Sequence, residues 1–414
     1  MKPGKDILFL CQYFYPEYIT SAQLPFDTVM ALKKAGFSVD VLCGYPREYL
    51  EGSDVPSQEE VVEGVSIRRL KYLQLNRAGF LGRLVNYFSF TLMVLLHLGK
   101  LAKYKSVLVY SNPPILPWVA SWGKALFGTK LVFVAYDLYP EAATVTGTLR
   151  EGSLICSLMR HINRVMFKRA SGVVALSSEE KEYIVRNRSY PPEKIFVIPN
   201  WFAQTDEEMA PRVPNPFRER SGNRFTVSYF GNMGTMQDMQ TIMDAMWELK
   251  EDDHLYFRFA GHGNKQQILR DFLCREHITN AEVLPFLHGQ DFRDALDASD
   301  CALVSLAPGT VGLCAPSKTY CYMFHGIPLA AVMEPCDIVR DIESGAGIWV
   351  KNGQSAELAR ELRMLSLDPD RCKKMGGVCR ELYRKCYAKQ SGTEKYVTLF
   401  RELLAPGQEK GNRI

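Results

Sequence analysis

The sequence predicts an α/β protein of two domains, each built around a parallel sheet. Apolar runs of strand length alternate with helix-length segments along the chain, the order typical of strand–helix–strand units. A chain of 414 residues is too long for one ordinary core. The alternation also stops at a proline-rich stretch, Pro199–Gly222, which we interpret as an interdomain linker. We therefore expect domains at 1–205 and 222–390 and a closing segment at 391–414.

Each half contributes its own set of strands. In the first half they are expected at Ile7–Cys11, Val39–Cys43, Ser66–Leu70, Val107–Tyr110, Leu131–Ala135, Gly172–Leu176 and Ile195–Ile198. In the second half they are expected at Phe225–Phe230, Tyr256–Ala260, Ala281–Leu284, Ala302–Ser305, Leu329–Val332 and Gly347–Val350. A helix from about Ala22 to Ala35 should end at Gly36, because glycine is a common helix C-cap.

Composition indicates a folded cytoplasmic protein. Hydrophobic residues make up 47% and charged residues 23% of the chain, as in globular domains. The first apolar run is too short for a signal-peptide core. The 11 cysteines are scattered and form no C-x-x-C pair, which favours a reduced protein over a disulfide framework or a zinc site.

Residues 64–136 contain ten lysines and arginines and no acidic residue. Such a stretch should attract anionic lipid headgroups or phosphates, so an anionic membrane surface is the expected partner. A basic surface with no specific partner is the alternative. Nucleic acid is not expected, because no nucleic-acid-binding motif accompanies the charge.

The segment Leu84–Ala102 is the one candidate for a membrane span. Asn86, His97 and Lys100 interrupt it, whereas a span needs roughly 20 apolar residues. We expect either a buried helix or a helix lying in the membrane interface, which would place the protein peripherally on the inner face of the plasma membrane.

Two glycine turns follow successive strands of the second half. They are Gly231-Asn232-Met233-Gly234 and Gly261-His262-Gly263. Glycine lets the backbone approach a phosphate closely, and ligands of open α/β sheets bind at the carboxyl ends of strands. Each turn alone is equally compatible with a tight turn that binds nothing.

The segment Pro316-Ser317-Lys318 opens a later helix of the same half. Ser317 is a good N-cap residue, and Lys318 adds a full positive charge to the helix dipole. Together they could offset the charge of a diphosphate. The alternative is an ordinary cap beside a solvated lysine.

In the first half, the strand Leu131–Ala135 runs directly into Asp137 and Glu141. Carboxylates at the carboxyl end of a strand could orient substrate hydroxyls or accept a proton. Capping of the next helix explains them equally well.

These motifs, in this order and spacing, resemble glycosyltransferase family 4, retaining enzymes of the GT-B fold, in the branch of bacterial capsule, O-antigen and exopolysaccharide synthesis. The resemblance covers essentially the whole chain. It rests on Gln12–Glu17, Asp137–Glu141, Val197–Asn200, Gly231–Gly234, Leu284–Phe286, Ser299–Asp300, and Pro316–Lys318 through Gly326–Pro328.

The resemblance implies two Rossmann-like domains that face each other, with the helix around Glu394–Leu404 crossing back to the first. It implies transfer of a sugar, with retained configuration, from a nucleotide-diphosphate sugar to a lipid-linked glycan acceptor. Asp137 and Lys318 would be catalytic. The donor would contact Gly231, Asn232, Gly234, Gly261, Phe286, Pro316, Ser317 and Lys318. The acceptor side would include Tyr15, Glu17 and Glu141.

The sequence departs from the family at three places. The two glutamates that many members carry eight residues apart are replaced by Leu313 and Cys321, and Thr235-Met236-Gln237 lacks the usual basic pair. A non-catalytic GT-B partner subunit and a nucleotide-sugar epimerase therefore stay open as alternatives. A nicotinamide oxidoreductase would need a fuller glycine fingerprint.

No metal or other cofactor is expected. A D-x-D pattern occurs at Asp368-Pro369-Asp370, but it lies between helical segments, away from every expected strand end.

Overall fold

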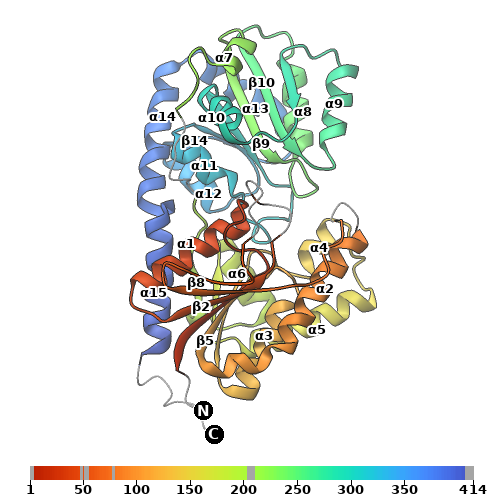
Figure 1. The fold of residues 1–414 in the computed structure, drawn as a ribbon. Helices are drawn as coiled ribbons and strands as arrows, with labels where there is room; N and C mark the ends of the chain where they lie inside the picture. The colour runs from red at the N-terminus through yellow and green to blue at the C-terminus, as the bar shows by residue number, and fades with distance from the viewer. Residues whose placement is uncertain (1–3, 47–49, 51–55, 77–79, 203–209, 406–414) are drawn as a thin grey trace. The chain divides into compact units, whose positions relative to one another are not determined.

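The computed structural model describes residues 4–46, 50, 56–76, 80–202 and 210–405. The chain forms two compact units (Figure 1). Unit 1 comprises residues 1–199, 312–314 and 389–414, and unit 2 comprises residues 200–311 and 315–388.

Unit 1 contains an eight-stranded sheet in the order β3-β4-β2-β1-β5-β6-β7-β8. Its strands are β1 Lys5–Leu10, β2 Val39–Gly44, β3 Glu59–Val62, β4 Val65–Leu70, β5 Tyr104–Tyr110, β6 Lys130–Val134, β7 Gly172–Ala175 and β8 Ile195–Val197. All seven strands expected for this half are confirmed, with ends shifted by a few residues.

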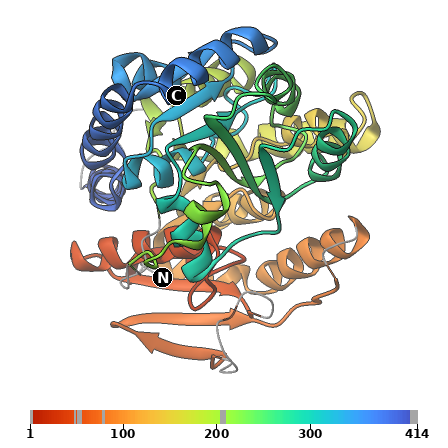
Figure 2. The same ribbon diagram turned by 90° about the horizontal axis from the view of Figure 1, so that it is seen from above.

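Strand β3 was not expected. It pairs antiparallel with β4 at the sheet edge, where Figure 2 shows the two as an orange hairpin. Its sequence is Glu-Glu-Val-Val with alternating exposure, so it lacks the apolar run that marks the parallel strands. Edge strands are solvated and need no such run.

The helices of unit 1 pack on both faces of this sheet. They are α1 Thr20–Lys34, α2 Phe80–Leu96, α3 Leu116–Phe127, α4 Glu141–Val145, α5 Leu154–Arg169, α6 Ser178–Arg188 and α15 Lys389–Leu404. The expected single helix at Leu84–Ala102 is wrong in its bounds. The α-helix ends at Leu96, and a 3₁₀ segment, Leu98–Lys103, follows.

Helix α15 packs against α1 in unit 1 (Figure 1). Phe400 is fully buried, with its ring 6.3 Å from that of Phe37. The Lys130 ammonium donates a hydrogen bond of 2.8 Å to the Leu403 carbonyl. Lys389, the first residue of the helix, pairs with Asp27 of α1.

Unit 2 contains a six-stranded parallel sheet in the order β11-β10-β9-β12-β13-β14. Its strands are β9 Phe225–Asn232, β10 Leu255–His262, β11 Ala281–Leu284, β12 Cys301–Ser305, β13 Leu329–Val332 and β14 Gly347–Val350. All six expected strands are confirmed.

The helices of unit 2 cover the sheet and enclose an apolar core. They are α7 Pro216–Arg220, α8 Met239–Glu248, α9 Gln266–Arg275, α10 Gly289–Asp297, α11 Lys318–His325, α12 Asp337–Asp341, α13 Ser355–Ser366 and α14 Pro369–Leu382. Short π-helical turns follow α12 and α14 at Ile342–Ala346 and Tyr383–Tyr387.

The proline-rich stretch is only partly a linker. Residues 203–209 lie outside the described part of the chain, but residues 210–222 are built into unit 2. Arg212 pairs with Asp294 of α10, and Arg218 pairs with Asp300 at 2.7 Å. Prolines and absent periodicity predicted a linker, whereas the ion pairs depend on residues far along the chain.

None of the 11 cysteines forms a disulfide bond. Among the described residues, no helix is both long enough and apolar enough to cross a membrane.

Candidate functional site

In unit 2 the backbones of β9 and β10 approach each other closely at their carboxyl ends. Gly231 and Gly261 are register partners in the parallel pair. A β-carbon placed on Gly261 would stand 1.9 Å from the Gly231 carbonyl oxygen, and one on Gly263 would stand 2.4 Å from the Met233 oxygen. Both glycines are therefore required for backbone packing, whatever they bind.

Three side chains fix the turn Gly231–Gly234 at the carboxyl end of β9. The Gln237 side-chain oxygen accepts from the Gly234 N–H at 2.9 Å. The Tyr229 hydroxyl donates to the Asn232 carbonyl at 2.7 Å. The Lys265 ammonium donates to the Gln237 carbonyl at 2.6 Å.

Lys265 is a basic residue at this turn that sequence reasoning missed. Burial lowers its pKa. The basic residues were sought just after Gly234, but Lys265 follows the second glycine turn and reaches the first only because β9 and β10 are neighbours.

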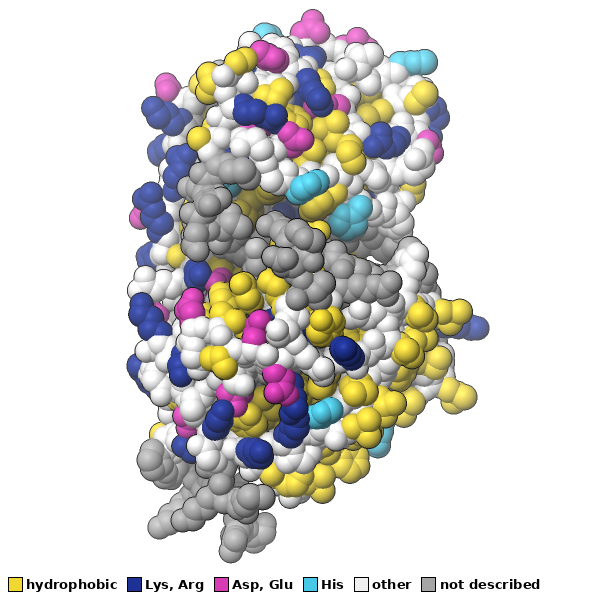
Figure 3. Space-filling view, in the orientation of Figure 1, with side chains coloured by type: hydrophobic (Ala, Val, Ile, Leu, Met, Phe, Trp, Pro, Cys, Tyr) yellow, Lys and Arg dark blue, Asp and Glu magenta, His cyan; other side chains and the backbone are white. Residues whose placement is uncertain are grey.

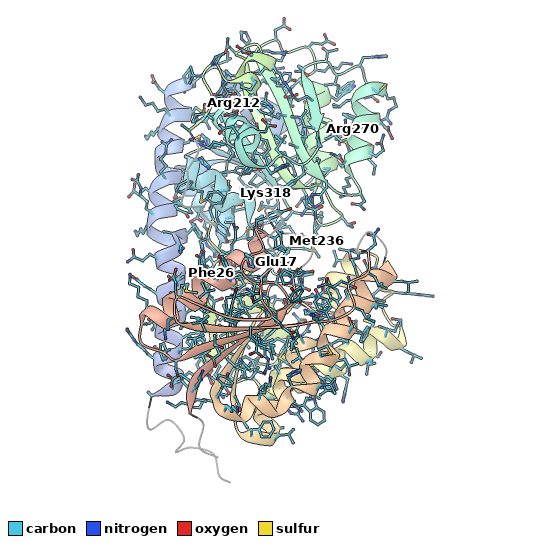
Figure 4. All side chains as sticks on the ribbon, in the orientation of Figure 1. Glu17, Phe26, Arg212, Met236, Arg270 and Lys318 are labelled. Carbon is cyan, nitrogen blue, oxygen red and sulfur yellow. The ribbon has the colours of Figure 1, made fainter. Side chains whose placement is uncertain are left out.

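Lys318, the first residue of α11, has a buried ammonium with no hydrogen-bond partner in the described part of the chain (Figure 4). Its Nζ lies 3.5 Å from the centroid of the Tyr229 ring and 3.9 Å from where a β-carbon of Gly231 would stand. Burial lowers its pKa to about 7. A buried cation without a polar partner is costly unless an anion joins it.

Ser317 occupies the N-cap position of α11, but its side chain makes no capping hydrogen bond. The expected cap is wrong in that respect, because the backbone of Ser317 is already helical rather than extended. The N–H groups of Thr319 and Tyr320 are bonded to the carbonyls of Pro316 and Ser317. Lys318 therefore carries more of the positive charge here than the helix terminus does.

Phe286 follows β11 and is exposed, with its ring 5.8 Å from that of His262. The Gln266 amide donates to the carbonyls of Gly261 and Leu284, at 3.0 and 3.1 Å, and so ties the ends of β10 and β11 together. Asn232 is also exposed. The predicted donor residues of unit 2 thus lie along one edge of its sheet or at the start of α11.

In unit 1, Asp137 follows β6 and its N–H donates to the Ser111 hydroxyl at 3.0 Å. Burial raises the pKa of its carboxyl group. Its carboxylate makes no hydrogen bond or ion pair to any residue that the structure describes.

Gln12 was noted only as part of a motif. It follows β1, is 1% exposed, and has both amide atoms unbonded among the described residues. Because β1 and β5 are neighbours, Gln12 and Ser111 end adjacent strands.

The three predicted acceptor-side residues have structural contacts in unit 1. The buried Glu17 carboxylate accepts from the Phe14 N–H at 3.2 Å. Glu141 pairs with Arg188 at 2.5 Å. The Tyr15 ring stacks on that of Phe26, with centroids 4.9 Å apart. Figure 4 labels Glu17 and Phe26.

The two positions that lack the family's glutamates are both buried. Leu313 belongs to the apolar core of unit 1 together with Leu138. Cys321 lies on α11, and burial raises the pKa of its thiol. Leu313 lies among apolar side chains, whereas the nearby Arg293 partly opposes the effect of burial on the pKa of the Cys321 thiol.

The D-x-D pattern has a structural role. Asp368 caps α14 by accepting from the Arg371 N–H at 2.9 Å. The described residues contain no group of three or more histidines, cysteines and carboxylates that could hold a metal ion.

Comparison with known proteins supports a glycosyltransferase activity. Residues 27–201 match the glycosyl transferase 4-like domain. A probable glycosyltransferase from Pseudomonas aeruginosa, WbjE, is 28% identical over 305 residues, which cover 72% of this chain and 75% of WbjE.

Two solved structures share the fold over nearly the whole chain. Sucrose-phosphate synthase from Thermosynechococcus elongatus superposes with a TM-score of 0.71 at 14% identity, covering 97% of this chain and all of that one. Anabaena HepE in complex with UDP superposes with a TM-score of 0.67 at 16% identity, covering 96% and 100%. The fold is GT-B, and the sequence matches support a glycosyltransferase.

Proposed function

We propose that the protein transfers a sugar from a nucleotide-diphosphate sugar to a lipid-linked glycan acceptor, with retained anomeric configuration, in surface polysaccharide synthesis. The observation that carries the proposal is Lys318, whose buried and unpaired ammonium lies beside the glycine turn after β9. The polysaccharide role rests on the motif resemblance.

A diphosphate fits the chemistry of this edge of unit 2. Its negative charge would supply the partner that the Lys318 ammonium lacks, and Gly231 leaves space for an oxygen where a side chain would stand. HepE, which shares the fold, has been solved with UDP and with UDP-glucose. The exposed Phe286 ring offers an apolar face for the base.

Lys318 would act on the leaving group. As the sugar–phosphate bond breaks, negative charge grows on the departing diphosphate, and a cation already in place stabilises it. In a front-face reaction the departing phosphate oxygen takes the acceptor proton, so no protein nucleophile is required. Asp137 would orient a hydroxyl of the acceptor or sugar.

The test is binding and transfer by matched lysine variants. Purified protein is screened by thermal shift against UDP, GDP, ADP and CDP and their sugars, because a ligand that binds the folded state raises the melting temperature. Lys318→Ala should abolish the shift and the transfer to a bacterial lipid extract. Lys373→Ala, on the exposed side of α14, is the control and should change neither. Full transfer activity in Lys318→Ala contradicts the proposal.

An exposed apolar surface of unit 1 supports the lipid-linked acceptor. Helices α2, α3 and α5 bury their inner sides in one core and so present their outer sides in the same direction. That outer surface is apolar where solvent-facing helices are usually polar. Its exposed residues are Leu81, Phe88, Leu92, Leu95 and Leu96 of α2, Leu126 and Phe127 of α3, and Leu154, Ile155 and Leu158 of α5.

We call these ten residues the apolar helix surface. Figure 3 shows hydrophobic side chains gathered over α2 and α5. Exposed basic residues, Arg83 on α2 and Arg164 and Lys168 on α5, accompany it. Apolar and basic groups together fit an anionic lipid surface. We propose that the protein is cytoplasmic and binds the inner face of the plasma membrane peripherally.

A non-catalytic partner subunit is the second candidate, favoured by the buried Leu313 and Cys321. Hydrolysis of a nucleotide-sugar by the purified wild-type protein, lost in Lys318→Ala, would contradict it.

A further inference from the structure

A single tyrosine contacts both parts of the proposed diphosphate site. Tyr229 lies on β9 with its side chain fully buried, and its ring stacks on that of Phe259 at 6.0 Å. The face of its ring lies against the Lys318 ammonium, 3.5 Å from Nζ to the centroid. Its hydroxyl donates to the Asn232 carbonyl in the glycine turn, at 2.7 Å.

The ring contact differs in kind from an ion pair. An aromatic face attracts a cation through its quadrupole and is strongest when the cation is desolvated. The ring carries no net charge, so it does not cancel the positive charge of the protonated lysine. It also leaves N–H groups of Lys318 uncommitted, in agreement with the missing hydrogen-bond partner. A carboxylate in the same place would cancel the charge that a phosphate needs.

The hydroxyl contact acts on the backbone. Burial raises the pKa of Tyr229, so the phenol remains a neutral donor. Its hydrogen bond holds the Asn232 carbonyl and therefore the path of the chain from Gly231 to Gly234. Lys265, which directly precedes α9, supports the same turn through the Gln237 carbonyl.

We propose that Tyr229 is a positioning residue for the donor diphosphate, whose ring face holds the Lys318 ammonium charged and in place while its hydroxyl holds the glycine turn. The inference rests on the proposed function and extends it, because it assigns two separable roles to one side chain that does not itself touch the donor.

The two roles can be separated by substitutions of Tyr229 that remove one contact at a time. Tyr229→Phe keeps the ring and loses only the hydrogen bond to the turn. Tyr229→trifluorophenylalanine keeps the shape of the Phe variant but withdraws electron density from the ring face, which weakens its attraction for a cation. Comparing these two isolates the ring contact at nearly constant volume. Tyr229→Met removes the ring altogether.

The measurement is UDP binding by calorimetry between pH 6 and pH 8.5, with the pH profiles compared between variants so that the ionisation of UDP itself cancels. Because protonated Lys318 binds the phosphates, affinity should fall as the pH rises through the pKa of that lysine. From Tyr229→Phe to the trifluoro variant we expect a further loss of about three- to thirty-fold and a fall in affinity that begins at lower pH. A general loss of packing would not move that pH.

Three outcomes would overturn the proposal or one of its parts. Equal affinity and equal pH profiles in the Phe and trifluoro variants overturn the role of the ring. Wild-type affinity in Tyr229→Phe overturns the role of the hydroxyl. If wild-type protein binds none of UDP, GDP, ADP or CDP, the donor site itself fails and this inference with it.

Discussion

At the scale of single residues, Gly261 and Lys318 differ in why the protein has them. Gly261 serves backbone packing, whereas Lys318 lowers the stability of the free protein. Gly261 is required by the backbone of its neighbour, since the Gly231 carbonyl fills the space of any side chain. Lys318 destabilises the folded protein, since its ammonium is buried without a hydrogen bond. Destabilised groups of this kind are typical of functional sites.

Gly261→Ala should destabilise unit 2 by about 1–3 kcal/mol or more, because β9 and β10 must separate to admit the methyl group. UDP binding should weaken with it. Gly377→Ala is the control: it lies within α14 with open space around it, so alanine there should be neutral or slightly stabilising. Chemical denaturation measures both variants. Wild-type stability in Gly261→Ala would contradict the close approach.

Lys318→Met should raise the melting temperature at pH 7 by a few degrees while removing UDP binding. The folded-state pKa, about 7, is below that of the unfolded chain, so the unfolded state binds the extra proton between them. Wild-type stability therefore rises with pH through this window, and the gain of the variant should shrink from pH 7 to pH 9.5. Thermal unfolding at several pH values measures it, and a gain that does not change with pH would contradict the assignment.

At the scale of elements, α2 has two faces with different tasks. Phe90 and Val94 belong to the core of unit 1, while Leu92 and Leu96 project outward and are 55% and 71% exposed. Their spacing makes the helix apolar nearly all round, which explains why the segment looked like a candidate span in the sequence. The outward face of α2 is the part of the helix that the proposed membrane contact would cover.

Leu92→Gln combined with Leu96→Gln should weaken binding to vesicles that contain phosphatidylglycerol at least about tenfold, because burial of each leucine contributes about 1.5–3 kcal/mol. Leu367→Gln, an equally exposed leucine of unit 2, should change nothing. Co-sedimentation at low and high salt measures the apolar and charged contributions. If the wild-type protein never sediments with these vesicles at low salt, the membrane proposal fails.

At the scale of the whole molecule, the chain enters unit 1 more than once. The last helix, α15, belongs to unit 1 although it follows the helices of unit 2 directly in sequence. The short segment 312–314 also belongs to unit 1, and through it Leu313 joins that core. Unit 1 therefore includes α15 in its packing.

Phe400→Ala should destabilise unit 1 by about 3–5 kcal/mol, because it empties a fully buried site between α15 and its neighbours. Hydrogen exchange should show the loss of protection in β1, β5 and α1, with little change in β9 and β10. Met364→Ala, at an exposed position of α13, is the control. Equal loss in the strands of both units would contradict the assignment of α15 to unit 1 alone.

The sequence by itself determined the strands and where the glycine turns and Lys318 lie among them. Apolar runs and turn residues are local signals, so thirteen expected strands were found in place. It did not reveal β3, the ion pairs of residues 210–222, or Lys265 at the glycine turn, since each depends on a partner far along the chain.

Only the tertiary structure decided what the candidate residues are doing. Glu17 and Glu141 are held by Phe14 and Arg188, whereas Asp137 and Lys318 have no such partner among the described residues. The order of residues does not show whether a charge is paired. That depends on burial and on which side chains folding brings within hydrogen-bonding distance. Lys318 is buried with the Tyr229 ring against its ammonium, and this contact could not be foreseen from the sequence.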